Sequence, residues 1–256
     1  MAKKSEIVLA EKISIISLCY NDETYIKKHF ENLSFANEII LIDNNSTDKS
    51  VEIATELGAT VMPQGNNFKA DCIKSAIESA KNNWIVLVSC TDHLPQGLIN
   101  EICSEISKPK TAASYYSGQT LLFFGKIIKY GVFLGRKKLL LFDKTRHTYT
   151  QSVDKSFFKR PKLFKNKIES FAYKNFDDFS NRLNVIRKEE AMVLFKRNKR
   201  PNIYHFFIKP LFTFIDQYFL KLGFLNGREG FILAYICAFS IVKRYYLLWL
   251  AYRNMD

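Results

Sequence analysis

The sequence predicts an α/β fold: a mostly parallel, Rossmann-like sheet with flanking helices, followed by an aromatic-rich C-terminal helical extension. Two observations predict the sheet. Short apolar runs alternate with helical patterns over the first 110 residues, and each run ends in polar, turn-forming residues. A third observation predicts the extension, since most of the 22 phenylalanines and 13 tyrosines lie in the second half of the chain.

Four short apolar runs are expected to form parallel strands, because a helical pattern connects each run to the next. These runs are residues 13–18, 38–42, 59–62 and 84–88. The expected helices are residues 25–33, 49–57, 71–81 and 95–107. Gly58 fits the left-handed position that ends a helix, and Pro95 fits the start of the helix that follows it.

The second half of the chain has a different pattern. Glycines interrupt residues 111–160, which are expected to be rich in β-structure, and residues 174–200 have the pattern of a charged helix. Residues 203–252 are apolar, aromatic and expected to be helical. The apolar run 231–242 is 12 residues long, whereas a membrane-spanning helix needs about 20. We therefore expect packed or amphipathic helices here.

Polar side chains follow three of the predicted strands. Tyr20 and Asn21 follow the first strand, Asp43 follows the second, and Asp92 follows the fourth. Ligands of parallel α/β sheets bind beyond the carboxyl ends of the strands, so these residues are candidates for a ligand site. Each candidate also has a structural alternative. Tyr20 can pack in the core, Asp43 can close a turn, and Asp92 can cap the next helix.

The net charge of +13 is unevenly distributed. Residues 1–110 hold 11 lysines, no arginine and 15 acidic residues (net −4), and the remainder holds 27 basic and 10 acidic residues (net +17). The basic runs 136–138 and 159–167 fit acceptor phosphates or anionic lipid headgroups, or else a solvated surface. Nucleic acid is a poorer match, because the sequence has no zinc finger, helix-turn-helix or aromatic RNA-binding motif. The 5 cysteines form no CxxC pair and fit reduced, mostly buried thiols.

Four segments together resemble a known family. They are ISIISLCYNDE at 13–23, ANEIILIDNNSTD at 36–48, the segment 84–92 and the tail 210–234. The chain resembles the family 2 glycosyltransferases of the GT-A fold, in particular the bacterial lipopolysaccharide-core glucosyltransferases. The resemblance implies a nucleotide-sugar-binding and catalytic domain at residues 1–200. Residues 201–256 then form an aromatic and basic extension that can associate with a membrane.

The resemblance implies nucleotide-sugar-binding roles for residues near the strand ends. Tyr20 matches the position that lies against the nucleotide base, and we assign Asn21 and Glu23 beside it to the same site. Asp43 matches the acid that hydrogen-bonds the base or nucleoside. Lys74 lies next to the position of a basic residue expected early in the third helix.

The metal site and the catalytic base are also implied by the resemblance. Asp92 matches the last acid of the family's Asp-x-Asp motif, which holds a divalent metal, Mg²⁺ or Mn²⁺, on the diphosphate. Cys90 replaces the motif's other acid, and His93 follows where relatives have an acid. Asp154 is the candidate base, and with Lys155 it replaces a His-Glu pair of close relatives. The alternative for Asp154 is a surface acid paired with a neighbouring basic residue.

We therefore expect an enzyme that transfers a hexose from a nucleotide-diphosphate sugar to a lipid-linked, lipopolysaccharide or capsule glycan, with inversion and metal assistance. The expected location is the cytoplasm, peripherally on the inner face of the cytoplasmic membrane, where an anionic surface is a partner. The alternative is a catalytically degenerate relative that binds the nucleotide or acts as a scaffold, which Cys90 and Lys155 favour. Nucleic acid is not expected as a partner.

Overall fold

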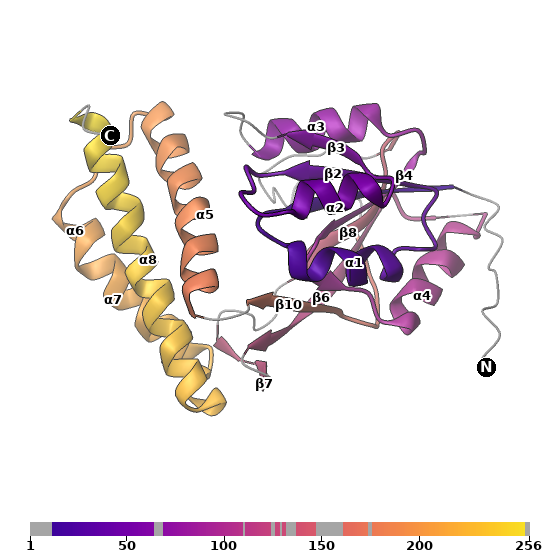
Figure 1. The fold of residues 1–256 in the computed structure, drawn as a ribbon. Coiled ribbons are helices and arrows are strands. Elements are labelled where there is room, and N and C mark those ends of the chain that lie inside the picture. The colour runs from indigo at the N-terminus through magenta and orange to yellow at the C-terminus, as the bar shows by residue number, and fades with distance from the viewer. Residues whose placement is uncertain are drawn as a thin grey trace. The chain divides into compact units, whose positions relative to one another are not determined.

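The computed structural model has two compact units. Met1–Gln119 and Lys137–Ser170 form the first unit, and Thr120–Arg136 and Phe171–Asp256 form the second. The structure describes residues 12–63, 69–109, 111–123, 126–128, 130–131, 137–146, 161–173 and 176–253. Strands and helices alternate through the first unit, which confirms the predicted α/β fold class (Figure 1).

The four predicted parallel strands lie side by side in the first unit. They are β1 (Ile13–Cys19), β2 (Glu38–Asp43), β3 (Thr60–Pro63) and β4 (Trp84–Ser89), in the spatial order β3-β2-β1-β4. The helices that connect and follow them are α1 (Glu23–Asn32), α2 (Ser50–Glu56), α3 (Lys69–Ser79) and α4 (Gln96–Ile106). Gly58 has a φ of 84° just past α2, which confirms that it ends this helix. Because the strands are parallel, their carboxyl ends share one edge of the sheet.

A mostly antiparallel extension continues the sheet beyond β4. Its strands are β8 (Lys137–Asp143), β6 (Ser114–Phe123), β10 (Ile168–Tyr173) and β5 (Asp92–His93), in that spatial order. β7 (Lys126–Ile128) pairs antiparallel with β6, and β9 (Lys162–Leu163) pairs parallel with it. β8 runs antiparallel to β4, with Leu141 opposite Val86 and Asp143 opposite Trp84. The first residues of β8 therefore lie beside the carboxyl end of β4, at the edge where ligands bind.

Both faces of the parallel strands are buried, which explains why their sequences are continuous apolar runs. On one face, Ile15 of β1 belongs to a cluster with Leu98 and Ile102 of α4. On the other face, Ile16 of β1 belongs to a cluster with Ala76 of α3. Successive residues of one strand thus contribute to two apolar layers, and the rigid sheet between them positions the polar residues at its edge.

Helices form most of the second unit. They are α5 (Phe176–Lys196), α6 (Ile203–Phe206), α7 (Ile208–Ile215), η2 (Asp216–Leu220), η3 (Gly223–Asn226) and α8 (Arg228–Tyr252). α5 and α8 lie side by side (Figure 1), and Glu190 of α5 accepts hydrogen bonds from Arg187 (2.7 Å) and Arg244 (3.0 Å). These elements agree with the charged helix and the helical tail expected from the sequence.

The length and composition of α8 would allow it to cross a membrane. An 18-residue window of this 25-residue helix has a mean hydropathy of 1.5, and half of the window is buried inside the structure. Core helices of proteins that cross no membrane also have these properties. These properties alone therefore do not assign α8 to a membrane.

The tail segment 210–234 makes a tight turn before α8. Asn226 Nδ2 donates to the Tyr130 carbonyl (3.1 Å), and Lys126 Nζ contacts both the Asn226 carbonyl and Glu229 Oε2 (2.9 Å each). A Cβ on Gly230 would lie 1.9 Å from the carbonyl oxygen of Gly223. The close approach of α8 to η3 therefore requires glycine at position 230.

Candidate active site

Two loops at the carboxyl edge of the sheet are bonded to each other, one following β1 and the other following β2. The Asn21 amide donates to Ser46 Oγ (3.0 Å), and the Thr47 amide donates back to Asn21 Oδ1 (2.8 Å). Asn21 has a φ of 51°, a conformation that asparagine tolerates better than most residues. The loop after β1 and the loop after β2 are thus joined by hydrogen bonds in both directions.

Acidic side chains complete the link between these loops. Asp48 Oδ2 accepts from the Glu23 amide, and Glu23 Oε2 accepts from the Lys49 amide (3.1 Å each). Asp48 Oδ1 accepts from the amide (3.0 Å) and the hydroxyl (2.5 Å) of Ser50, the first residue of α2. Asn21 and Glu23 therefore hold the two loops together, and their contact with a nucleotide sugar stays a prediction.

Asp43 and Tyr20 lie at the ends of β2 and β1. The buried Asp43 carboxylate accepts from the Ser46 amide, which is 3.2 Å from both of its oxygens. Asp43 thus closes the turn before α2, yet a carboxylate has lone pairs for further donors. Tyr20 is half-buried, and its amide donates to Asp22 Oδ2 (3.0 Å). The predicted nucleoside contacts of Asp43 and Tyr20 stay predictions.

Asp92 is the centre of a buried hydrogen-bond network. Its Oδ1 accepts from Ser170 Oγ of β10 (2.5 Å), and its Oδ2 accepts from the Ser89 amide of β4 (2.9 Å) and from Lys138 Nζ of β8 (2.5 Å). Burial alone would raise the pKa of Asp92, but the Lys138 charge and these hydrogen bonds hold that pKa below its usual value. The group is therefore an ionised carboxylate whose charge Lys138 balances.

Sequence reasoning missed two of the Asp92 partners and assigned the third to another role. Nothing local identifies Ser170 as a partner of Asp92. Lys138 belongs to the basic run 136–138, which we interpreted as a surface for phosphates or lipid headgroups. Its ammonium instead binds Asp92, and the Lys138 side chain is 21% exposed while that of Asp92 is 3% exposed.

His29 of α1 contacts the backbone of Asp92, and the sequence analysis did not identify it as part of this network. Its Nε2 is 2.9 Å from Ser17 Oγ, and its Nδ1 is 3.2 Å from the Asp92 carbonyl oxygen. A carbonyl only accepts, so Nδ1 carries the proton and Nε2 accepts from the serine. Burial is the main cause that lowers the pKa of His29 to about 4. A histidine on a helix gives no local signal of such burial.

The described residues around Asp92 do not fit a hard divalent metal in their present arrangement. Mg²⁺ and Mn²⁺ bind oxygen ligands with lone pairs directed at the ion. The groups that contact the Asp92 carboxylate are an ammonium, a hydroxyl and a backbone amide, which all donate to it. A metal at Asp92 would have to displace Lys138. The Mg²⁺ or Mn²⁺ site at Asp92 stays a prediction.

A second group of potential ligands lies between the ends of β1 and β4. Ligand atoms of Cys19, Asp22 and Cys90 lie within 4.8 Å of one another, and all three residues are buried. For comparison with this limit of 4.8 Å, two thiolates bound to one tetrahedral zinc ion would be roughly 3.8 Å apart. A hydrogen bond with Cys19 and burial raise the pKa of Cys90 well above its usual value. Both cysteines also belong to one apolar cluster with Ile26 and Ala54, so the group is consistent with ordinary core packing.

The remaining predicted residues lie apart from this centre or outside the described part of the chain. Lys74 is exposed on α3. Asp154, the candidate base, lies outside the described residues. Asp143 is an acid of the same region that the structure does describe, and it binds Arg146 Nε (2.7 Å) and Thr145 Oγ1 (2.6 Å).

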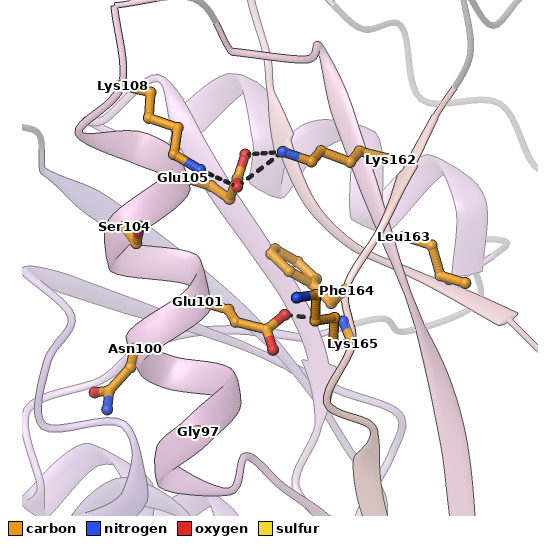
Figure 2. Close-up of a pocket in the computed structure, with 10 residues that line it drawn as sticks. All are labelled: Gly97, Asn100, Glu101, Ser104, Glu105, Lys108, Lys162, Leu163, Phe164 and Lys165. Atoms are coloured by element: carbon orange, nitrogen blue, oxygen red, sulfur yellow. Dashed lines mark hydrogen bonds and ion pairs between the residues drawn. The ribbon is translucent and has the colours of Figure 1, made fainter.

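A surface pocket of about 620 Å³ lies between α4 and β9 (Figure 2). Figure 2 shows Glu105 of α4 directed at Lys162 of β9, and Lys162 Nζ is 2.9 Å from each Glu105 oxygen. Glu105 also binds Lys108, and Glu101 accepts from the Lys165 amide (2.9 Å). None of the described residues predicted to bind the donor or the metal lines this pocket, although Lys162 and Lys165 belong to the basic run 159–167. Glu105 is paired with Lys108 and Lys162. The pocket is therefore not the candidate active site.

Comparison with protein families gives a match over more than half of the chain. The family model described as glycosyl transferase family 2 matches residues 14–166. An uncharacterized glycosyltransferase of Rickettsia bellii is 25% identical over 91% of this chain and 84% of its own length. One of Rickettsia typhi is 24% identical over 90% of this chain and 84% of its own length.

Comparison with solved structures gives a more distant match. The chain aligns with glucosyl-3-phosphoglycerate synthase of Mycobacterium tuberculosis in complex with Mn²⁺, uridine-diphosphate and glucosyl-3-phosphoglycerate, at a TM-score of 0.37 and 16% identity. The alignment covers 44% of each chain. A complex of the same enzyme with Mn²⁺ and uridine-diphosphate-glucose aligns with the same values.

Proposed function

The chain belongs to glycosyl transferase family 2, and we propose that it transfers a hexose from a nucleotide-diphosphate sugar to a glycan acceptor, with inversion at the sugar carbon. One observation carries the proposal. Tyr20, Asp43 and Asp92 follow three neighbouring parallel strands, so all three lie at the carboxyl edge of the sheet. This edge is where α/β sheets bind nucleotides.

The donor's nucleoside fits the ends of β1 and β2. A half-buried tyrosine ring at position 20 offers a flat apolar surface to a base. The Asp43 carboxylate can accept hydrogen bonds from a base N–H or from ribose hydroxyls in addition to the one from Ser46. The bonded loops after β1 and β2 hold both groups in place, which reduces the entropy lost when the nucleoside binds.

Transfer requires that the leaving diphosphate be neutralised and the acceptor hydroxyl deprotonated. In an inverting transfer the acceptor oxygen attacks the sugar carbon as the diphosphate leaves from the opposite side. Asp154 remains the proposed base for the hydroxyl proton. The groups around Asp92, in their present arrangement, do not fit a metal ion, so no step of the transfer is assigned to one.

The acceptor is proposed to be a lipid-linked, lipopolysaccharide or capsule glycan reached from the cytoplasmic face of the membrane. Large apolar side chains that are more than half exposed concentrate in the second unit. Those on the helices of this unit are Ile203, Tyr204, Phe207, Ile208, Leu211, Phe212, Phe219, Leu220, Leu225, Tyr235 and Phe239. Aromatic rings favour the headgroup region of a bilayer, and basic residues favour its anionic surface. We call these residues the exposed apolar surface and propose that it contacts the membrane.

A thermal-shift titration of the purified chain with nucleotide-diphosphate sugars of each common base tests the donor. A donor that binds only the folded state should stabilise it by about 2.7 kcal/mol at a hundredfold excess over its Kd. Asp43→Asn keeps an oxygen for the Ser46 amide but loses the charge, and should weaken binding about tenfold or more. Glu52→Gln, an exposed change on α2, is the control and should bind normally.

Two results would contradict two separate parts of the proposal, donor binding and the position of the nucleoside. If no nucleotide sugar stabilises the chain, donor binding is wrong. If Asp43→Asn binds as well as Glu52→Gln, the nucleoside assignment is wrong. Binding without transfer to native glycan acceptors would favour the degenerate, scaffold-like relative, which the Cys90 replacement already suggests.

A further inference from the structure

We propose that the Lys138 ammonium binds the donor's diphosphate in place of a divalent cation, so that donor binding requires no metal. The inference rests on the proposed function and names the group that recognises the donor's phosphates. Lys138 is the second residue of β8, and β8 runs antiparallel to β4. This direction places Lys138 beside Ser89 at the carboxyl end of β4, with Nζ 3.5 Å from Ser89 Oγ. The ammonium therefore stands at the edge of the sheet where the diphosphate would lie.

Lys138 is held in place and still reaches solvent. Its Nζ is 2.5 Å from Asp92 Oδ2, and the buried Asp92 is fixed by Ser170 and the Ser89 amide. The lysine side chain is 21% exposed. An ammonium has three donors, and the contacts with Asp92 and Ser89 use at most two of them. One donor is left for a phosphate oxygen.

Before the donor binds, the charges of Asp92 and Lys138 balance each other without a metal. A divalent cation in this position would find one carboxylate and would meet the ammonium, which repels it. A lysine at a phosphate site acts as a point charge and replaces part of the hydration of the phosphate.

Calorimetry with the full-length chain and UDP, GDP, ADP, CDP or dTDP tests the proposal, in EDTA and in Mn²⁺ or Mg²⁺. The nucleotide that binds should do so with the same Kd, within about twofold, in all three buffers. Lys138→Met should weaken binding in EDTA about 10- to 100-fold, the loss expected for a charged hydrogen bond to phosphate. Lys137→Met, the preceding exposed lysine of β8, is the matched control and should bind as the wild type does.

Lys138→Met leaves the Asp92 carboxylate buried without its counter-charge, and the variant can fail to fold. The double variant Lys138→Met/Asp92→Asn removes both charges; the asparagine oxygen can accept from the Ser89 amide, and its Nδ2 can donate to the Ser170 hydroxyl oxygen. It should fold and should show the same loss of metal-free binding. Wild-type affinity in the double variant would overturn the proposal.

The outcomes separate this inference from the proposed function. Wild-type binding that appears only with Mn²⁺ or Mg²⁺ would overturn the role of Lys138, favour the metal site at Asp92, and leave the transferase proposal intact. Absence of binding for every nucleotide in every buffer would overturn both. Metal-independent binding that depends on Lys138 but not on Lys137 would support both.

Discussion

His29 makes the stability of the first unit depend on pH in a predictable direction. The side chain is 3% exposed, and its pKa in the folded chain is about 4, against 6.5 for an unperturbed histidine. Between these two values the unfolded chain binds a proton at this position and the folded chain does not. Acid therefore favours unfolding in this range, and stability rises as the pH increases from about 4 to 6.5.

The size of the effect follows from the two pKa values. Each pH unit between them is worth about 1.4 kcal/mol, so acidification across the whole window should cost about 3 kcal/mol of unfolding free energy. At pH 5 the loss should be about 2 kcal/mol. Carboxylates with lowered pKa values, such as Asp92 and Asp143, lose their contribution only at lower pH.

Urea unfolding followed by circular dichroism, at several pH values from 7 to 4.5, measures this slope. His29→Gln is the comparison, because glutamine can hydrogen-bond to Ser17 but does not titrate. The variant should be less stable at pH 7 and should lose less stability on acidification. If wild type and variant lose stability in parallel over this range, His29 titrates normally in the folded chain and the reasoning is refuted.

Two further predictions concern the second unit. Gly230→Ala would place a Cβ 1.9 Å from the Gly223 carbonyl oxygen, and the resulting overpacking should cost roughly 1–3 kcal/mol and lower the Tm. Tyr235→Ala, 57% exposed on the same helix, should change the Tm little. Phe207→Asp/Phe212→Asp, at side chains that are 69% and 61% exposed, should abolish flotation with anionic vesicles. Leu57→Asp, an exposed site of the first unit, should float normally, and flotation of the double variant would refute the membrane proposal.

The parallel half of the sheet could be predicted from the sequence because its signals are local. Each strand is an apolar run, each run ends in turn-forming residues, and Gly58 marks the end of α2 by a conformation that glycine adopts at little cost. The parallel direction of the strands follows from the helices between them. The edge of the sheet that carries Tyr20, Asp43 and Asp92 could therefore be located from the sequence alone.

The contacts around Asp92 could not be predicted, because they depend on long-range pairing. Lys138 and Ser170 are 46 and 78 residues away from Asp92. They reach it because β8 pairs with β4 and β10 pairs with β5. Residues 111–160 gave only a general expectation of β-structure, which specifies neither strand order nor register. The same limit explains why Lys138 was interpreted as part of a basic surface.

The network around Asp92 also determines which experiment can identify its role. Four elements converge on this residue, since His29 of α1 contacts its carbonyl and β4, β8 and β10 supply the donors to its carboxylate. Asp92→Ala would leave Lys138 without its partner and Ser170 without its acceptor, so it would reduce activity whether or not Asp92 binds a metal. A loss of activity in that variant is therefore uninformative. Binding by the wild type with and without metal, compared with binding by the variant that removes the charges of Asp92 and Lys138 together, separates a metal ligand from an anchor for the ammonium.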